Sequence, residues 1–161
     1  MATQQAEATQ GSAAPSTEAF LLAAKIKPGQ ADALREAVTA NAKLIEDPNG
    51  SLSQVGTVHF VRVAILNDDT FLFASHFDGD IEPYLDDFYT VTLGGLGFDA
   101  VLRYCEDWPG PNDREGFIEF WKSHRVPDIL TYAHYPGVTC KEIEKALRIR
   151  TNLEAVLEDF Q

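Results

Sequence analysis

The chain has little cysteine, few basic residues and no long apolar run. Its two cysteines, Cys105 and Cys140, are too few for the disulfide framework of a small secreted domain. The net charge of −12 argues against nucleic acid or an anionic membrane surface as a partner. No apolar stretch approaches the roughly 20 residues that span a bilayer, and residues 1–17 lack the basic start and apolar core of a signal peptide. We therefore expect a protein of the reducing cytoplasm.

The sequence also lacks the motifs that are typical of a particular enzyme chemistry. The sequence contains no phosphate-binding loop, nucleophile elbow or dinucleotide fingerprint. Its four histidines are scattered, without a cysteine or paired carboxylate at the spacing of a zinc site, so we predict no metal centre. Cys105 and Cys140 lack a CxxC spacing and are expected to pack as small apolar residues.

What is present suits one globular domain. Residues 1–17 are small, polar and aperiodic and predict a disordered tail, and residues 18–161 predict a single domain with a C-terminal helical extension. Apolar periodicity and turn residues predict the following elements. They are a strand at 19–26, a helix at Ala31–Ile45, strands at Val55–Leu66 and Phe71–Asp78, a helix at Ile81–Thr92, a strand at Phe98–Glu106, a helix at Arg114–Val126, a strand at Ile129–Tyr135 and a helix at Thr139–Glu158.

The first six elements run β-α-β-β-α-β, the order of a ferredoxin-like α+β domain with an antiparallel sheet and helices on one face. Helices on one face would leave the other face bare, yet the hairpin Val55–Asp78 is apolar on both faces. A second copy packed against the bare face would resolve this conflict. We therefore predict a homodimer, in the form of a dimeric α+β barrel.

The hairpin also brings ionisable residues together. With Asp68-Asp69 as a two-residue loop, His59 pairs with Asp78, and His76 lies diagonal to His59. The same register places Arg62 on the opposite face. A slip of one residue would exchange the faces of one strand.

Three segments carry a resemblance to a known superfamily. They are His59-Phe60-Val61-Arg62, Ser75-His76-Phe77-Asp78-Gly79 and Tyr84-Leu85-Asp86-Asp87-Phe88. Across roughly residues 20–108, the chain resembles bacterial members of the dimeric α+β barrel superfamily, the nearest of them of unassigned function. That superfamily includes antibiotic-biosynthesis-type monooxygenases, haem-degrading enzymes, chlorite dismutases and dye-decolourising peroxidases, so the resemblance implies a fold more than a reaction.

The resemblance raises haem as a cofactor. The peroxidases carry a Gly-x-x-Asp-Gly motif and two such domains in one chain. Here Ser75 stands where the first glycine belongs, and the chain has room for one domain, which argues against peroxidase activity. If haem binds, His124 on the helix predicted at Arg114–Val126 is the candidate axial ligand. Otherwise His124 is a cation placed at a helix C-terminus.

The candidate catalytic residues are His59, Asp78 and His76. A carboxylate beside an imidazole is the usual arrangement of a general base, although the two groups could simply satisfy each other at the end of a sheet. The candidate ligand-binding residues are Arg62, Phe60 and Phe77. Arg62 could hold a carboxylate-bearing ligand, or it could pair with a nearby acid such as Asp86 or Asp87.

Two hypotheses on function remain open. One is a small homodimeric protein that binds an apolar or carboxylate-bearing small molecule, with an oxidoreductase of the monooxygenase type as its enzymatic form. The other is a non-catalytic structural or interaction module. Neither hypothesis involves nucleic acid or a membrane.

Overall fold

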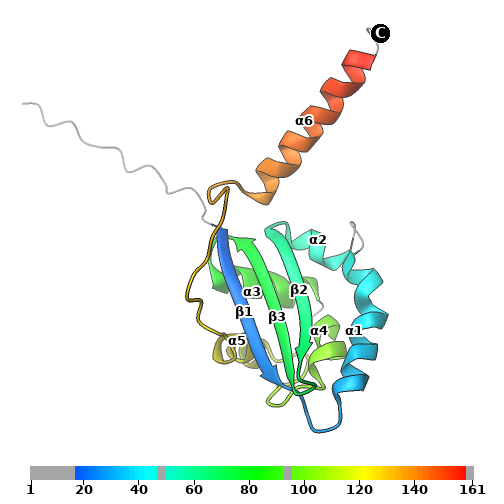
Figure 1. Cartoon of the computed structure of the whole chain (residues 1–161), viewed down its shortest axis with the longest axis vertical. Helices are drawn as coiled ribbons and strands as arrows, with labels where there is room; N and C mark the ends of the chain where they lie inside the picture. Colours follow the sequence, from blue (N-terminus) through cyan, green and yellow to red (C-terminus); the bar gives the residue numbers. More distant parts are fainter. Residues whose placement is uncertain (1–16, 47–49, 93–95, 159–161) are drawn as a thin grey trace, which may run out of the picture.

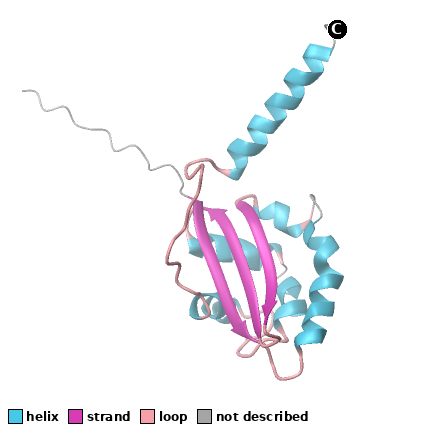
Figure 2. Ribbon diagram, viewed as in Figure 1, coloured by secondary structure: helices cyan, strands magenta, loops and turns pink. Residues whose placement is uncertain are grey.

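The computed structural model describes residues 17–46, 50–92 and 96–158, so most of the predicted tail lies outside the described residues. A three-stranded antiparallel sheet carries helices on one face, which confirms the predicted α+β class (Figures 1 and 2). The elements are β1 (Thr17–Lys25), α1 (Ala31–Glu46), α2 (Ser51–Val55), β2 (Val58–Leu66), β3 (Thr70–Asp78), α3 (Ile81–Val91), α4 (Leu96–Leu102), α5 (Arg114–Ser123) and α6 (Cys140–Glu158).

The sheet has the strand order β1-β3-β2, and its two faces differ in burial. On one face, every second residue of β1 and β3 is buried against the helices. That face contributes Phe20, Leu22, Ala24, Phe71, Phe73 and Phe77, which meet Tyr84, Leu85 and Phe88 of α3 and Phe117, Phe120 and Trp121 of α5 in one core. The other face carries no helix of the described chain along its length, and we call it the open face (Figure 2).

The hairpin register differs by one residue from the predicted one. The loop spans three residues, because Leu66 pairs with Thr70 rather than Phe71. Asn67 and Asp68 take positive φ angles of 52° and 58°, a conformation that Asn and Asp tolerate better than most residues. Arg62 consequently pairs with Ala74 and lies on the open face, so the prediction that Arg62 and His59 occupy opposite faces is wrong.

The predicted strand Phe98–Glu106 is also wrong, because the chain forms α4 there. Phe98, Val101, Leu102 and Cys105 follow the i, i+3, i+4, i+7 spacing of a helix. The alternate residues Phe98, Ala100, Leu102 and Tyr104 would equally suit one face of a strand. In the structure Leu102 and Cys105 are fully buried. The only strand-like pairing left in this region is a single bridge between Cys105 and Ile26.

The edge of β1, where the fourth strand of a ferredoxin-like sheet would lie, is covered by the chain that follows α5. The Val126 N–H donates to the Leu21 carbonyl (2.7 Å), and the Ala23 N–H donates to the His124 carbonyl (3.0 Å). Pro127 has no N–H to extend this pairing. Residues 129–135 are irregular and mostly exposed, so the predicted strand Ile129–Tyr135 is wrong as well.

The C-terminal helix α6 confirms the predicted helix at this position, and it stands away from the rest of the fold (Figure 1). Residues 141–157 of this helix are all exposed. The strand predicted at Val55–Leu66 begins later, at Val58, because Val55 is the last residue of the short helix α2. Residues 47–49, before α2, lie outside the described chain. Within the described ranges, no helix combines the length and the apolar character needed to cross a membrane.

Candidate functional site

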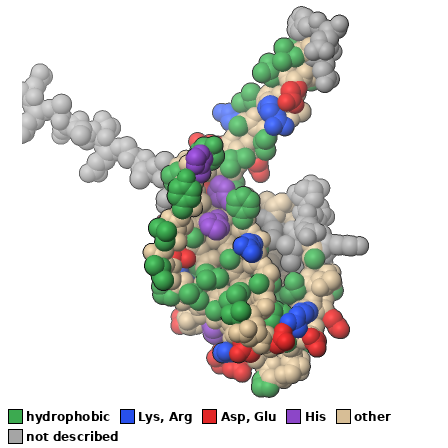
Figure 3. Space-filling view, viewed as in Figure 1, with side chains coloured by type: hydrophobic (Ala, Val, Ile, Leu, Met, Phe, Trp, Pro, Cys, Tyr) green, Lys and Arg blue, Asp and Glu red, His purple; other side chains and the backbone are tan. Residues whose placement is uncertain are grey.

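A hollow of about 690 Å³ lies at the end of the open face nearest to α6. Its walls come from the outer face of β2 and β3, from the segment before α6 and from the first turn of α6. They are lined by Thr17, Val58, His59, Phe60, His76, Tyr132, Ala133, His134, Tyr135, Val138, Cys140, Ile143 and Glu144. Figure 3 shows histidines gathered in this part of the surface, beside a broad spread of hydrophobic side chains over the sheet. Aromatic and aliphatic groups thus surround a few polar ones.

His59 lines the polar end of this hollow and pairs with Asp78, which is not itself part of the lining. His59 Nε2 lies 2.6 Å from Asp78 Oδ1, and the two side chains are only 10% and 8% exposed. A register shift between Val58 and Phe60 marks an irregularity in β2 at His59. This irregularity lets His59 reach Asp78 even though the strand register differs from the predicted one. Bonded in this way, an Nε2–H imidazole donates to Asp78 and keeps the Nδ1 lone pair free.

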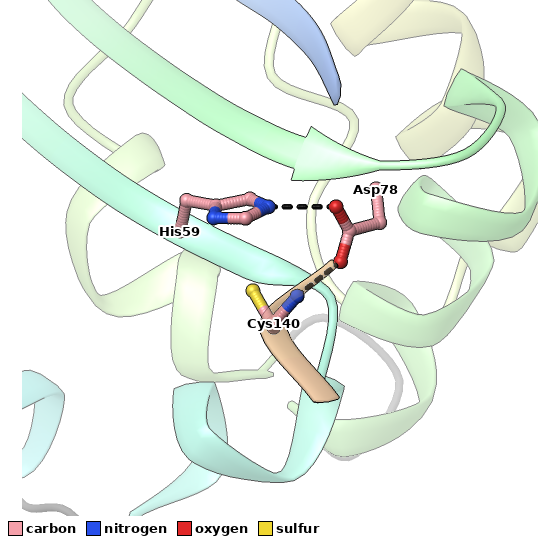
Figure 4. A group of neighbouring side chains, drawn as sticks. All are labelled: His59, Asp78 and Cys140. Carbon is pink, nitrogen blue, oxygen red and sulfur yellow. Dashed lines mark hydrogen bonds and ion pairs between the residues drawn. The ribbon is translucent and has the colours of Figure 1, made fainter. Parts of the chain in front are cut away.

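Cys140 completes the group from the start of α6. Its backbone N–H donates to Asp78 Oδ2 (2.8 Å), so both carboxylate oxygens of Asp78 are engaged (Figure 4). Burial raises the pKa of the Cys140 thiol to about 11, and the negative charge of nearby Asp78 adds to the effect. Cys140 is therefore a neutral thiol at pH 7 rather than an activated nucleophile.

The other sequence-predicted residues divide between the hollow and the rest of the fold. His76 and Phe60 line the hollow with His59. Arg62 lies on the open face but outside this lining, and among the described side chains it has no ion-pair partner, neither Asp86 nor Asp87. Phe77 is buried in the core and stacks on Tyr84 at 3.8 Å between ring centroids, so the structure does not bring it to the hollow.

His124, the candidate haem ligand, also lies outside the hollow. It caps α5, where its Nδ1 lies 2.9 Å from the Phe120 carbonyl and its ring packs on the Phe120 ring. This half-buried position agrees with the structural alternative stated for it, a histidine at a helix C-terminus.

Sequence reasoning singled out only His59, Phe60 and His76 of the hollow; the residues that it missed include Tyr132, His134, Tyr135 and Cys140. The Tyr132 hydroxyl and His134 Nδ1 are 2.9 Å apart, and the His134 ring meets Tyr135 edge to face. A cluster of aromatic residues and histidine in a segment without periodicity was the available signal, because loops often carry binding residues. For Cys140 no local signal existed, since its partner Asp78 is 62 residues away.

Comparisons with known proteins add one structural likeness. No family model matches the chain, and no curated protein matches it. A solved structure described as tetracenomycin F2 cyclase from Streptomyces glaucescens, a type-II polyketide cyclase, is similar with a TM-score of 0.44 and 13% identity, over 72% of this chain and 97% of that chain. Similarity at this level says nothing about the chemistry of the hollow.

Proposed function

We propose that the protein binds a small, largely apolar molecule in the hollow on the open face, with His59 as the polar contact. The observation that carries this proposal is His59, whose side chain is only 10% exposed in the wall of a hollow lined mainly by apolar and aromatic residues, and whose Nε2 pairs with the buried Asp78 carboxylate. Ligand sites usually measure about 300–1,000 Å³ and combine an apolar lining with a few placed polar groups. Arg62 lies on the same face, has no ion-pair partner among the described side chains and would favour a ligand that carries a carboxylate.

The pair would also allow proton transfer from a bound ligand. Asp78 orients the His59 ring through Nε2, and the carboxylate is itself held by the Cys140 N–H. Nδ1 of His59 would then accept a proton from a ligand hydroxyl or an acidic C–H, as a general base. His76, on the same wall of the hollow, would add a second imidazole.

A fluorescent dye that is apolar and anionic, such as anilinonaphthalene sulfonate, tests the binding site. We expect Phe60→Ala to weaken dye binding about tenfold, which corresponds to about 1.4 kcal/mol. Leu66→Ala is the matched control, because Leu66 is an exposed apolar residue of the same strand outside the hollow. Equal affinities in wild type, Phe60→Ala and Leu66→Ala would contradict the proposed site.

The variant His59→Gln tests whether His59 contributes to ligand binding or only to the stability of the fold. The glutamine amide can still donate to Asp78, so we expect the free energy of unfolding to change by less than about 1 kcal/mol. Dye displacement by aromatic carboxylic acids should weaken, because the imidazole is lost. A large loss of stability with unchanged displacement would favour the non-catalytic alternative, in which the pair only fixes the end of the sheet.

We also propose that a second copy of the chain covers the open face. Fourteen large hydrophobic side chains are exposed among the described residues, and they occur only in β2 and between residues 129 and 157. Those of α6 are Ile143, Leu147, Ile149, Leu153, Val156 and Leu157. A helix that makes so few tertiary contacts is unstable in water by itself, so an apolar partner surface would stabilise it.

The area of the proposed interface requires both the open face of the sheet and the apolar side of α6. Three strands of nine residues present roughly 30 by 14 Å, about half of the roughly 800 Å² that each partner buries in a standard interface. A helix of 19 residues is roughly 28 Å long, and its apolar side would supply much of the remainder. The helix carries four basic and four acidic residues, so it does not add to the repulsion between two chains of net charge −12.

A further inference from the structure

Three side chains that commonly bind metal ions converge at the polar end of the hollow. His59 comes from the irregular part of β2, Asp78 from the last position of β3, and Cys140 from the first position of α6 (Figure 4). One imidazole nitrogen, one carboxylate oxygen and the sulfur atom all lie within 4.8 Å of one another. No spacing along the chain predicts this group, which is why the sequence argued against a metal centre.

We propose that His59, Asp78 and Cys140 bind a divalent transition-metal ion of the zinc class, with a fourth coordination position directed to the hollow. Three protein ligands and one open position are the arrangement of catalytic zinc sites, in which water or a ligand atom completes the tetrahedron. The proposal rests on the proposed ligand site for its location, because the open position would face the bound molecule.

The distances fit such an ion after a small adjustment. Zn–N and Zn–O distances of about 2.0–2.2 Å and a Zn–S distance of about 2.3 Å place tetrahedral ligand atoms roughly 3.3–3.6 Å apart. The group therefore needs shifts on the order of one ångström from its present spread. The backbone N–H of Cys140 already holds Asp78 Oδ2, which is the kind of support that orients a ligating carboxylate.

The donor set selects the class of metal. A thiolate and an imidazole favour zinc and its neighbours in the first transition row, whereas magnesium and calcium prefer oxygen ligands alone. The thiol must lose its proton on binding, so one proton leaves Cys140 as the metal–sulfur bond forms.

Metal binding would change the role of His59. A neutral imidazole has one lone pair, and a histidine that uses it on the metal cannot accept a proton. In the metal-loaded protein, the base would instead be a water molecule bound at the open position, whose pKa a zinc ion lowers to about 7. The Nδ1 mechanism described above would then apply to the metal-free protein alone.

Cobalt substitution provides the test. The full chain, without a histidine tag, is stripped with a chelator, dialysed and titrated with Co²⁺ and then with Zn²⁺. We expect one equivalent of Co²⁺ to produce a thiolate-to-cobalt charge-transfer band, and Zn²⁺ to displace it. Cys140→Ser should abolish the band and weaken Zn²⁺ binding at least about tenfold. Cys105→Ala should retain both, because Cys105 lies fully buried in the core.

The remaining outcomes are equally decisive. Absence of the band in wild type, or an equal band in Cys140→Ser, would overturn the metal site. His59→Gln and Asp78→Asn should each weaken Zn²⁺ binding, so the proposal stays testable if Cys140→Ser fails to fold. Dye binding by the metal-free protein is measured in parallel. Loss of the metal result with Phe60-dependent dye binding intact would overturn the metal site alone, and the reverse would overturn the ligand site alone.

Discussion

Tyr84 and Ser75 form a hydrogen bond in the interior, between the helix side of the sheet and α3. The Tyr84 hydroxyl donates to Ser75 Oγ, and the two residues are 2% and 1% exposed. Burial raises the pKa of Tyr84 far above its ordinary value of 10, so the hydroxyl is a neutral donor at pH 7. Ser75 would otherwise be a polar group among phenylalanines, and the bond removes that cost.

We expect Tyr84→Phe and Ser75→Ala each to lower the free energy of unfolding by about 1–3 kcal/mol, because each leaves a buried polar group without its partner. The double variant should lose clearly less than the sum of the two, since it removes both polar groups. Urea denaturation of the four proteins measures this coupling. Tyr89→Phe, on the same helix, is the control and should stay within about 0.5 kcal/mol of wild type. Additive losses would show that the two residues act independently.

At the scale of elements, two ion pairs join α3 to α5. Lys122 pairs with Glu82, and Arg114 Nε donates to Asp86 Oδ1 at 2.7 Å. These bonds lower the pKa of Glu82 and of Asp86 below their ordinary values of 4.5 and 3.8. Both carboxylates are exposed at the surface, so solvent and salt screen the two pairs.

A carboxylate whose pKa is lower in the folded than in the unfolded state stabilises the fold above its unfolded value. That contribution is therefore complete above about pH 4.5 and disappears as the pH falls through the lowered values. We expect Glu82→Gln with Asp86→Asn to reduce the melting temperature by a few degrees at most at pH 7, and the difference to shrink steadily as the pH falls below about 4. Asp32→Asn, whose carboxylate pairs within α1, is the control. A difference that persists or grows at low pH would argue against these pairs.

At the scale of the whole molecule, the proposed dimer interface comprises the open face and α6. We expect light scattering at micromolar concentration to report a dimer for wild type. Leu147→Glu, in the apolar side of α6, should shift the protein towards monomer, because it places a charge within the proposed interface. Asn152→Glu adds the same charge to the other side of the helix, at 100° per residue, and should leave the dimer intact. A monomeric wild type would contradict the interface.

The hairpin and the region of α4 show which features a local sequence pattern predicts and which it does not. Strand β3 matches its predicted range within one residue at its start, because a run rich in aromatic and other apolar residues that follows turn residues is a strong strand signal. Its partner register was off by one, because Asn67, Asp68 and Asp69 are all acceptable turn residues and local chemistry does not choose among them. The helix α4 was taken for a strand, because a run of seven residues can satisfy both periods.

The amino-acid sequence by itself determined the α+β class and the helices α1, α3, α5 and α6. These follow from spacing within one element or across one short loop. Only the tertiary structure decided the rest: which face Arg62 occupies, what covers the edge of β1, and the position of Cys140 beside Asp78. Contacts between distant segments depend on how all the apolar faces pack together in one core, and a local sequence pattern carries no information about that packing.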